Sequence, residues 1–264
     1  MLELKNIYKT FNAGTVNEKR ALQGLNLSLA DGDFVTVIGG NGAGKSTMLN
    51  IISGAYTVDE GSISIGGVDV TKLPEYKRAS YIGRVFQDPM MGTAATMQIE
   101  ENLALAARRG QRRGLRTGIS RTERDQYREL LKILDLGLED RLTSKVGLLS
   151  GGQRQALTLL MATLKKPQLL LLDEHTAALD PKTAAKVLAA TEQIVRRDNL
   201  TTLMITHNMR DAIAHGNRLI MLYDGRVVVD VRGEEKRRLT VEDLLEKFNQ
   251  ASGSSEADDK LLLS

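Results

Sequence analysis

Residues 34–53 read Phe-Val-Thr-Val-Ile-Gly-Gly-Asn-Gly-Ala-Gly-Lys-Ser-Thr-Met-Leu-Asn-Ile-Ile-Ser, and this stretch decides the fold. Its first five residues, Phe34 to Ile38, form a short apolar run that predicts a buried strand. A glycine-rich turn follows at once, and a helix is expected from about Lys45 to Ser53. Strand, glycine loop and helix in this order bring backbone amides and a helix N-terminus together around an anion.

The loop carries the P-loop pattern, in which a first glycine is followed, after four further residues, by Gly-Lys-Ser. Glycines let backbone N–H groups turn toward phosphate oxygens. Lys45 is expected to reach the β and γ phosphates of a nucleotide, Ser46 to ligate Mg²⁺, and Thr47 to donate to the α phosphate. The alternative, a glycine-rich turn with a chance lysine, is disfavoured by the flanking strand and helix. The candidate nucleotide-binding residues are Gly39, Gly40, Asn41, Gly42, Ala43, Gly44, Lys45, Ser46 and Thr47.

A second apolar run, Leu169 to Leu172, ends in Asp173 and Glu174. Ligands of open parallel sheets sit beyond the carboxyl ends of the strands, so both carboxylates are expected near the loop. Asp173 is placed to hold Mg²⁺ through a water, and Glu174 to orient and deprotonate a water that attacks the γ phosphate. Without the P-loop, the pair would be interpreted as a strand end that begins a turn.

The composition bounds the class of protein. The chain has 264 residues and a formal net charge of only +3, a mild bias that does not by itself indicate nucleic acid. It has no cysteine, which excludes disulfide bonds and thiolate metal sites. No stretch reaches the roughly 18 to 20 uninterrupted apolar residues of a membrane span, so work at a membrane would require other chains to cross it.

A third segment, Leu149–Gln153, reads Leu-Ser-Gly-Gly-Gln and precedes a helical run to Leu164. Ser150 is a good helix N-cap, and Gly151 and Gly152 leave the first amides of the helix bare. The segment is thus a second anion-binding helix N-terminus in one chain. One nucleotide does not need both from the same subunit. Two copies arranged head to tail would let each offer this segment to the γ phosphate bound by the other.

In combination these segments resemble the ABC ATPase cassette, in which Leu-Ser-Gly-Gly-Gln lies between a P-loop and a Leu-Leu-Leu-Leu-Asp-Glu strand. The other motifs of that family follow in order. They are Phe11 at the place of the adenine-stacking aromatic, Gln87 at the Q-loop glutamine, Asp180 at the D-loop and His207 at the switch histidine. The resemblance covers about residues 1–232, and the set of motifs is very specific.

The resemblance implies an α/β fold with a P-loop NTPase core of the RecA-like kind and a mainly parallel sheet. Strand and helix signals that alternate along the chain agree with that class. An antiparallel β subdomain and an inserted helical subdomain at about 89–165 are implied as well. The expected organisation is an ATPase domain at 1–232, a helical extension at 233–250 and a disordered tail at 251–264.

The resemblance also implies residue roles. The catalytic residues would be Glu174, His207, Gln87 and Lys45. The Mg²⁺ ligands would be Ser46, Gln87 and Asp173. The residues that close over the ATP of the other copy would be Ser150, Gly151, Gly152 and Gln153, with Asp180 crossing the dimer interface. Phe11 would stack on adenine, and Gln87 would in addition contact the membrane subunits.

The implied function is ATP hydrolysis, with ATP and Mg²⁺, by a head-to-tail homodimer that binds two ATP at its interface. The dimer would lie in the cytoplasm as a peripheral protein on the inner face of the cell membrane. It would energise separate permease subunits served by an extracytoplasmic substrate-binding protein, and nucleic acid is not an expected partner. Residues 149–163 and 173–183 resemble bacterial importer ATPases of tryptophan or aromatic amino-acid systems, which favours import of an amino acid.

Two alternatives stay open at this point. Some exporters also keep the cassette on its own chain, so export is the main alternative to import. A non-transport ABC ATPase is less favoured: the DNA-repair proteins split the core with a long coiled coil, and the sequence between Lys45 and Ser150 has no sustained heptads. Ribosome-acting relatives carry two cassettes in one chain, whereas this chain has one.

Two residues next to the Asp173–Glu174 pair depart from the family pattern. His175 stands where proline is usual, and Ala177 lacks the usual serine hydroxyl. His175 is interpreted as a tolerated variant, with a tuning group beside Glu174 as the alternative.

The sequence also has an arginine-rich stretch, interpreted as a solvated loop, with contact to anionic lipid head groups as the alternative. Its members are Arg108, Arg109, Arg112, Arg113, Arg116, Arg121 and Arg124.

Overall fold

The computed structural model describes residues 1–111 and 118–252, with side chains through Gln250. A six-stranded central sheet has the order β10-β9-β3-β8-β7-β6. Its strands are β3 (Phe34–Ile38), β6 (Ile82–Val85), β7 (Leu169–Asp173), β8 (Thr201–Ile205), β9 (Arg218–Tyr223) and β10 (Arg226–Arg232). All neighbouring pairs run parallel except the β9–β10 hairpin. The carboxyl ends of β3, β8 and β7 therefore meet along one edge of the sheet.

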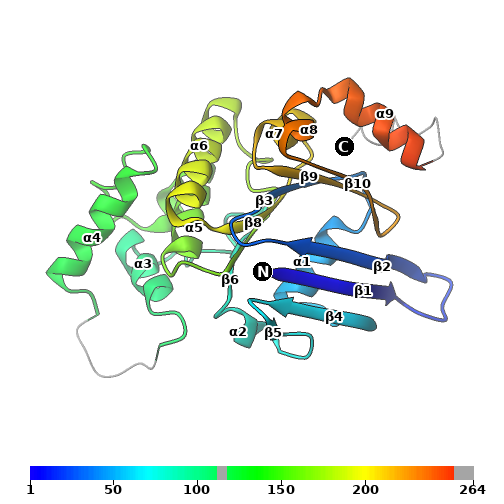
Figure 1. The fold of residues 1–264 in the computed structure, drawn as a ribbon. Coiled ribbons are helices and arrows are strands. Elements are labelled where there is room, and N and C mark those ends of the chain that lie inside the picture. Colours follow the sequence, from blue (N-terminus) through cyan, green and yellow to red (C-terminus); the bar gives the residue numbers. More distant parts are fainter. Residues whose placement is uncertain (112–117, 253–264) are drawn as a thin grey trace.

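A second, four-stranded sheet is antiparallel and has the order β2-β1-β4-β5. Its strands are β1 (Leu2–Phe11), β2 (Lys19–Leu29), β4 (Glu60–Ile65) and β5 (Val68–Asp69). Helix α1 (Lys45–Ser53) lies between the two sheets and shares one buried apolar cluster with both (Figure 1). That cluster joins Leu4 of β1, Leu49 of α1 and Val37 of β3, so the helix that follows the glycine loop is packed on two sides.

Helices form the other side of the molecule, across the central sheet from α1. Residues from α3, α4, α5 and α6 share a second buried cluster with β7, which includes Leu103, Leu131, Leu157, Ile194 and Leu172. The helices are α2 (Glu75–Arg78), α3 (Ile99–Ala107), α4 (Arg121–Lys132), the 3₁₀ turn η1 (Val146–Leu148), α5 (Gly151–Thr163), α6 (Pro181–Asp198), α7 (Met209–Ala214), α8 (Gly233–Arg238) and α9 (Val241–Ser252). None of the helices in the described ranges combines the length and apolarity that a membrane crossing requires.

The predicted fold class is confirmed, with a mainly parallel core sheet and a separate antiparallel sheet. The predicted strand at 34–38 and helix at 45–53 coincide with β3 and α1. The C-terminal helix continues through Ser252, two residues past the expected end of the extension at 250. Residues 253–264, where the disordered tail was expected, lie outside the described residues.

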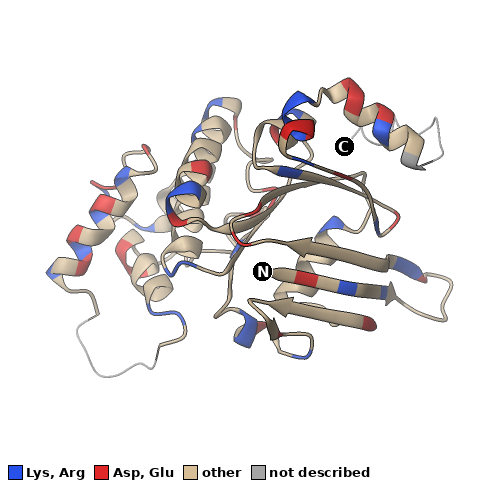
Figure 2. Ribbon diagram, in the orientation of Figure 1, with Lys and Arg blue, Asp and Glu red and all other residues tan. Residues whose placement is uncertain are grey.

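The arginine-rich stretch is only partly described. Positively and negatively charged residues alternate along α4 (Figure 2). Arg124 forms a two-pronged pair with the buried Glu100 of α3, at 2.5 and 2.8 Å, and Arg108 lies 2.8 Å from Glu123. Both arginines therefore connect α3 to α4. Of the other predicted members, Arg109 and Arg121 are described, whereas Arg112, Arg113 and Arg116 lie outside the described residues.

Candidate active site

Three segments meet at the shared carboxyl edge of the central sheet. The glycine loop follows β3, Glu174 follows β7, and His207 follows β8. Their side chains line a pocket of about 280 Å³ together with residues from the end of β1 and the start of β2. The lining residues are Phe11, Lys19, Ala21, Gly40, Asn41, Gly42, Ala43, Gly44, Lys45, Ser46, Thr47, Glu174 and His207.

Neighbouring backbone holds the glycine loop at both of its ends. Gly39 has φ +148° and Gly44 has φ +103°, conformations that side chains rarely adopt. A Cβ at Gly39 would lie 2.3 Å from the Leu222 carbonyl oxygen, and one at Gly44 would lie 2.6 Å from the Ala21 carbonyl oxygen. The loop is therefore fixed between β9 and β2, and both glycines are required by close approach as well as by backbone angle.

Lys45 points its ammonium group back into the loop. Its Nζ donates to the Gly39 carbonyl oxygen at 2.5 Å and to the Gly40 carbonyl oxygen at 3.2 Å, and the residue is 5% exposed. Burial lowers the pKa of Lys45, and the nearby carboxylates of Glu174 and Asp173 oppose that shift. A buried cation enclosed by backbone amides is suited to hold a phosphate group.

Glu174 and His207 form the pair that faces the loop. His207 Nε2 lies 2.5 Å from Glu174 Oε1, and the carboxylate side chain is 9% exposed. Glu174 adopts φ +47°, and its N–H donates to the Ile205 carbonyl oxygen at 3.1 Å. A carboxylate fixed by an imidazole and facing a pocket is a group that can accept a proton from water.

Asp173 lies one residue before this pair and contacts an arginine that the sequence interpretation missed. Burial raises the pKa of Asp173, and Arg84 Nη2 lies 3.5 Å from its Oδ2. Arg84 also donates to Ser53 Oγ at 3.0 Å and to Asn50 Oδ1 at 2.8 Å, so it joins β6 to α1. The sequence did contain a signal for Arg84, since it is a charged residue inside the apolar run at 81–86. A buried charge requires partners, so such a residue indicates an ion pair or a hydrogen-bond network.

The donor set fits a magnesium ion that is shared with phosphate. Among the described residues, no three His, Cys, Asp or Glu side chains come together as a metal cluster. Ser46 lines the pocket, and the Asp173 carboxylate ends the strand beside it. Magnesium usually takes one or two protein oxygens and completes its shell with waters and substrate phosphates, which a hydroxyl and a single carboxylate allow.

Phe11, which lines the pocket, pairs with a second aromatic ring. Phe11 meets the ring of Tyr56 edge-on, with ring centroids 5.4 Å apart and an interplanar angle of 76°. Lys9 approaches the Phe11 ring at 5.6 Å and forms an ion pair with Asp59 at 2.8 Å. Tyr56 and Asp59 both follow α1, so the chain after the phosphate-facing helix contacts the strand that carries Phe11. The sequence interpretation did not anticipate Tyr56.

Several predicted site residues do not line this pocket. Gln87 lies exposed in the loop after β6. Ser150 caps α5: its Oγ accepts from the Gln153 N–H at 3.3 Å, and Gln153 Oε1 accepts from the Ser150 N–H at 3.2 Å. Gly151 is exposed at the first turn of α5. Asp180 caps α6 through the Thr183 N–H at 3.0 Å.

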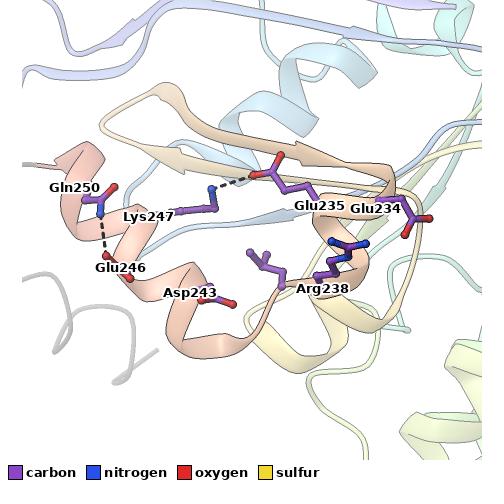
Figure 3. Close-up of a pocket in the computed structure, with 8 residues that line it drawn as sticks. Glu234, Glu235, Arg238, Asp243, Glu246, Lys247 and Gln250 are labelled. Atoms are coloured by element: carbon purple, nitrogen blue, oxygen red, sulfur yellow. Dashed lines mark hydrogen bonds and ion pairs between the residues drawn. The ribbon is translucent and has the colours of Figure 1, made fainter.

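A larger hollow of about 660 Å³ lies between α8 and α9 (Figure 3). Two interactions join its lining residues: Lys247 lies 3.0 Å from Glu235, and Gln250 donates to Glu246 at 3.0 Å. It contains no glycine loop and no carboxylate–imidazole pair. The smaller pocket at the sheet edge is therefore the candidate active site.

Comparison with known proteins agrees with this assignment. A family model described as ABC transporter matches residues 22–177. The tyrosine transport ATP-binding protein of Clostridioides difficile strain R20291 is 47% identical over 251 residues, which cover 95% of this chain and all of that protein. The methionine import ATP-binding protein of Bartonella henselae is 34% identical over 88% of this chain, which spans 65% of that relative's length.

A solved structure gives the same result at the level of the fold. It is a dimeric post-hydrolysis state of an ATP-binding cassette bound to ADP and Pi, with a TM-score of 0.75. The two chains are 33% identical, and the match covers 88% of this chain and 98% of that one. With the family model, the full-length relative and the pocket in agreement, the chain belongs to the ABC transporter family as one of its ATPase cassettes.

Proposed function

We propose that this ATPase hydrolyses ATP between two copies of itself and thereby energises import through separate membrane-spanning subunits. One observation carries the proposal: a carboxylate and an imidazole, 2.5 Å apart, face a P-loop and an aromatic ring in one pocket. That combination offers a place for phosphates, a place for a base ring of the nucleotide and a proton acceptor between them.

Each residue of the pocket has a physical role in this proposal. Lys45 and the loop amides bind the phosphates, and Phe11 stacks on adenine. Glu174 takes the proton of the attacking water, and His207, whose Nε2 holds the carboxylate in this structure, would donate to the γ phosphate once ATP is bound. Magnesium, held by Ser46 and Asp173, would neutralise charge on the phosphate oxygens, and Gln87 would complete its surroundings from the loop after β6.

A head-to-tail homodimer is proposed because the N-termini of α1 and α5 are both suited to bind phosphate but do not share a pocket. The N-terminus of α5, with Ser150 and Gly151, is exposed and lies outside the lining of the P-loop pocket. A second copy would bring its own α5 N-terminus over the γ phosphate, along with Gly152 and Gln153. Asp180, exposed at the start of α6, would lie at the same interface.

We further propose that the imported molecule is an aromatic amino acid, bound first by an extracytoplasmic protein and passed to a permease. The support is the relative that matches over its entire length, since its name refers to tyrosine transport. The cassette would then work on the cytoplasmic face of the membrane. Substrate choice would be made by the permease and the binding protein, because the pocket in this chain is built for a nucleotide.

The test is isolation of tagged Glu174→Gln protein from its native membranes in the presence of ATP and Mg²⁺. A multispan permease and a binding protein that copurify would support import, and binding of tyrosine, tryptophan and methionine to that binding protein would then be measured by calorimetry. A permease alone would move the function to export. Ribosomes or DNA-processing proteins without a permease would overturn transport. Lys45→Ala protein is the matched control, because it should not capture the ATP-dependent partners.

A further inference from the structure

His175 directly follows Glu174 in sequence, but its side chain lies inside the protein. It is 2% exposed and does not line the P-loop pocket. It is also absent from a second hollow of about 630 Å³, which Glu174 and His207 border together with the start of α6. The ring is thus turned away from the nucleotide side of the sheet edge. An acid or base role for the ring at the γ phosphate does not fit this position.

One hydrogen bond fixes the ring. His175 Nε2 lies 3.1 Å from Thr191 Oγ1, and the Thr191 hydroxyl donates to the Val187 carbonyl oxygen at 2.8 Å. A hydroxyl has a single proton, so here it accepts from the ring, and Nε2 carries hydrogen. Thr191 is fully buried in the middle of α6, which makes it a rigid anchor.

The surroundings keep this ring neutral. Burial, and to a smaller extent the charge of nearby His215, lower the pKa of His175 to about 4. His215 is itself bonded to Glu192 at 2.9 Å, and Lys236 donates to the carbonyl oxygens of His215 and Gly216. The Thr191 hydrogen bond itself requires only that Nε2 carries a hydrogen.

The backbone that this bond secures is unusual. Glu174 has φ +47°, a left-handed conformation that is unfavourable for a residue with a side chain. Such conformations persist where the surrounding structure determines them on both sides. Before Glu174 the chain is held by β7, and its N–H binds Ile205. After Glu174, the Ala177 N–H binds its carbonyl oxygen at 3.0 Å, and His175 is anchored to α6.

We propose that His175 is a positioning residue for ATP hydrolysis, because its hydrogen bond to Thr191 ties the chain after Glu174 to α6 and holds the carboxylate against His207. The inference rests on the proposed role of Glu174 as the base. It assigns His175 a purpose that the usual proline would meet by ring rigidity, and that this chain meets by a buried hydrogen bond. The loop from Glu174 to Asp180 is then fixed to α6 at both ends.

The experiment compares steady-state kcat and KM for ATP in four full-length variants. His175→Leu and Thr191→Val remove the donor and the acceptor with little change of volume, whereas Thr191→Ser and His175→Gln keep a hydroxyl and an N–H. We expect kcat to fall about 10- to 100-fold in His175→Leu and about 3- to 10-fold in Thr191→Val. KM should stay within about twofold, because nucleotide binding does not use these groups. Thr191→Ser should match wild type, and His175→Gln should recover part of the loss.

Two further measurements keep the outcome decisive. In the double variant His175→Leu/Thr191→Val, kcat should be no lower than in His175→Leu alone, because both changes remove one interaction. If His175→Leu does not fold, the comparison of Thr191→Val with Thr191→Ser decides. Equal kcat in those two variants, with Glu174→Gln inactive, would overturn the positioning role only. Wild-type hydrolysis by Glu174→Gln would instead overturn the base assignment, and this inference with it.

Discussion

Helices α1 and α5 both begin at a glycine-containing segment, but their N-termini differ in capping, in exposure and in the side chains that face them. Helix α1 begins after Gly44, which has no side chain with which to cap the first amides, and the buried Lys45 and the Glu174–His207 pair face it. Helix α5 begins after Ser150, which caps the helix with its own hydroxyl and stays exposed. The first lies in a pocket, whereas the second is exposed outside that pocket.

This difference is what a site divided between two copies, as proposed above, would require. A phosphate at α1 meets a cation, bare amides and a proton acceptor, so binding and chemistry both have groups on this side. A phosphate at α5 alone would meet only a partly capped helix end in water, where a helix dipole is worth about 1 kcal/mol or less. The N-terminus of α5 would bind a phosphate more strongly if it were covered, and in the proposed dimer the P-loop pocket of the other copy would supply that cover.

The largest effect is expected from Glu174→Gln, which removes the proton acceptor on the α1 side. The rate of phosphate release should fall by about 10²- to 10⁴-fold, the usual range for a general base. ATP should still bind, because Lys45 and the loop are untouched, and size-exclusion chromatography with ATP should show a stable dimer. A rate equal to wild type would mean that the α1 pocket contains a different base.

A mixing experiment tests the division between copies. Ser150→Arg places a bulky side chain at the α5 start, and Lys45→Ala disables the α1 pocket; each variant alone should lose about 10²-fold or more in rate. A heterodimer of the two has one intact pocket facing one intact α5 start, so an equal mixture should recover activity. The control is each variant mixed with itself at the same total concentration. If the mixture stays as inactive as its parts, the two starts do not complete one another.

The features that could be predicted from the sequence are those that depend on local pattern. The α1 side was predicted to the residue, because β3, the glycine loop and α1 are adjacent in sequence and their pattern is local. Glu174 was expected beside it because ligands of a parallel sheet lie at the carboxyl ends of its strands, and His207 was expected there from the resemblance to the family's switch histidine. Arg84 and Tyr56 were missed, since their contacts depend on how β6 and the chain after α1 pack in space. The burial of His175 could not be predicted from local sequence pattern either, because its hydrogen-bond partner Thr191 lies on α6.

A smaller effect distinguishes the two glycines of the α5 start. A Cβ at Gly152 would lie 1.9 Å from Thr183 Cγ2 on α6, whereas the nearest atom to one at Gly151 is Leu179 Cδ2 at 3.8 Å. Gly152→Ala should therefore lower the unfolding free energy by about 1 to 3 kcal/mol, as overpacking does. Gly151→Ala should leave it unchanged or slightly higher, because alanine favours the helix.

Denaturant unfolding of both variants measures the free energy of unfolding, and Thr183→Ser serves as the compensating substitution. Serine at position 183 removes the methyl group that the new Cβ would meet and leaves the backbone cap of Asp180 in place. The double variant Gly152→Ala/Thr183→Ser should regain most of the lost stability. If it does not, then Gly152 is required for something other than its approach to α6.

The smallest effect is expected at the far end of the α1 pocket, where Phe11→Ala removes the ring proposed to stack on adenine. An aromatic contact is worth about 0.5 to 1.5 kcal/mol beyond its area, so KM for ATP should rise about 3- to 10-fold, and kcat should change little. Phe11→Tyr keeps the ring and is the matched control. Inorganic triphosphate, which has no base, should bind both variants and wild type alike. An unchanged KM for ATP in Phe11→Ala would assign the adenine platform to another residue, with Tyr56 the nearest aromatic at 5.4 Å between ring centroids.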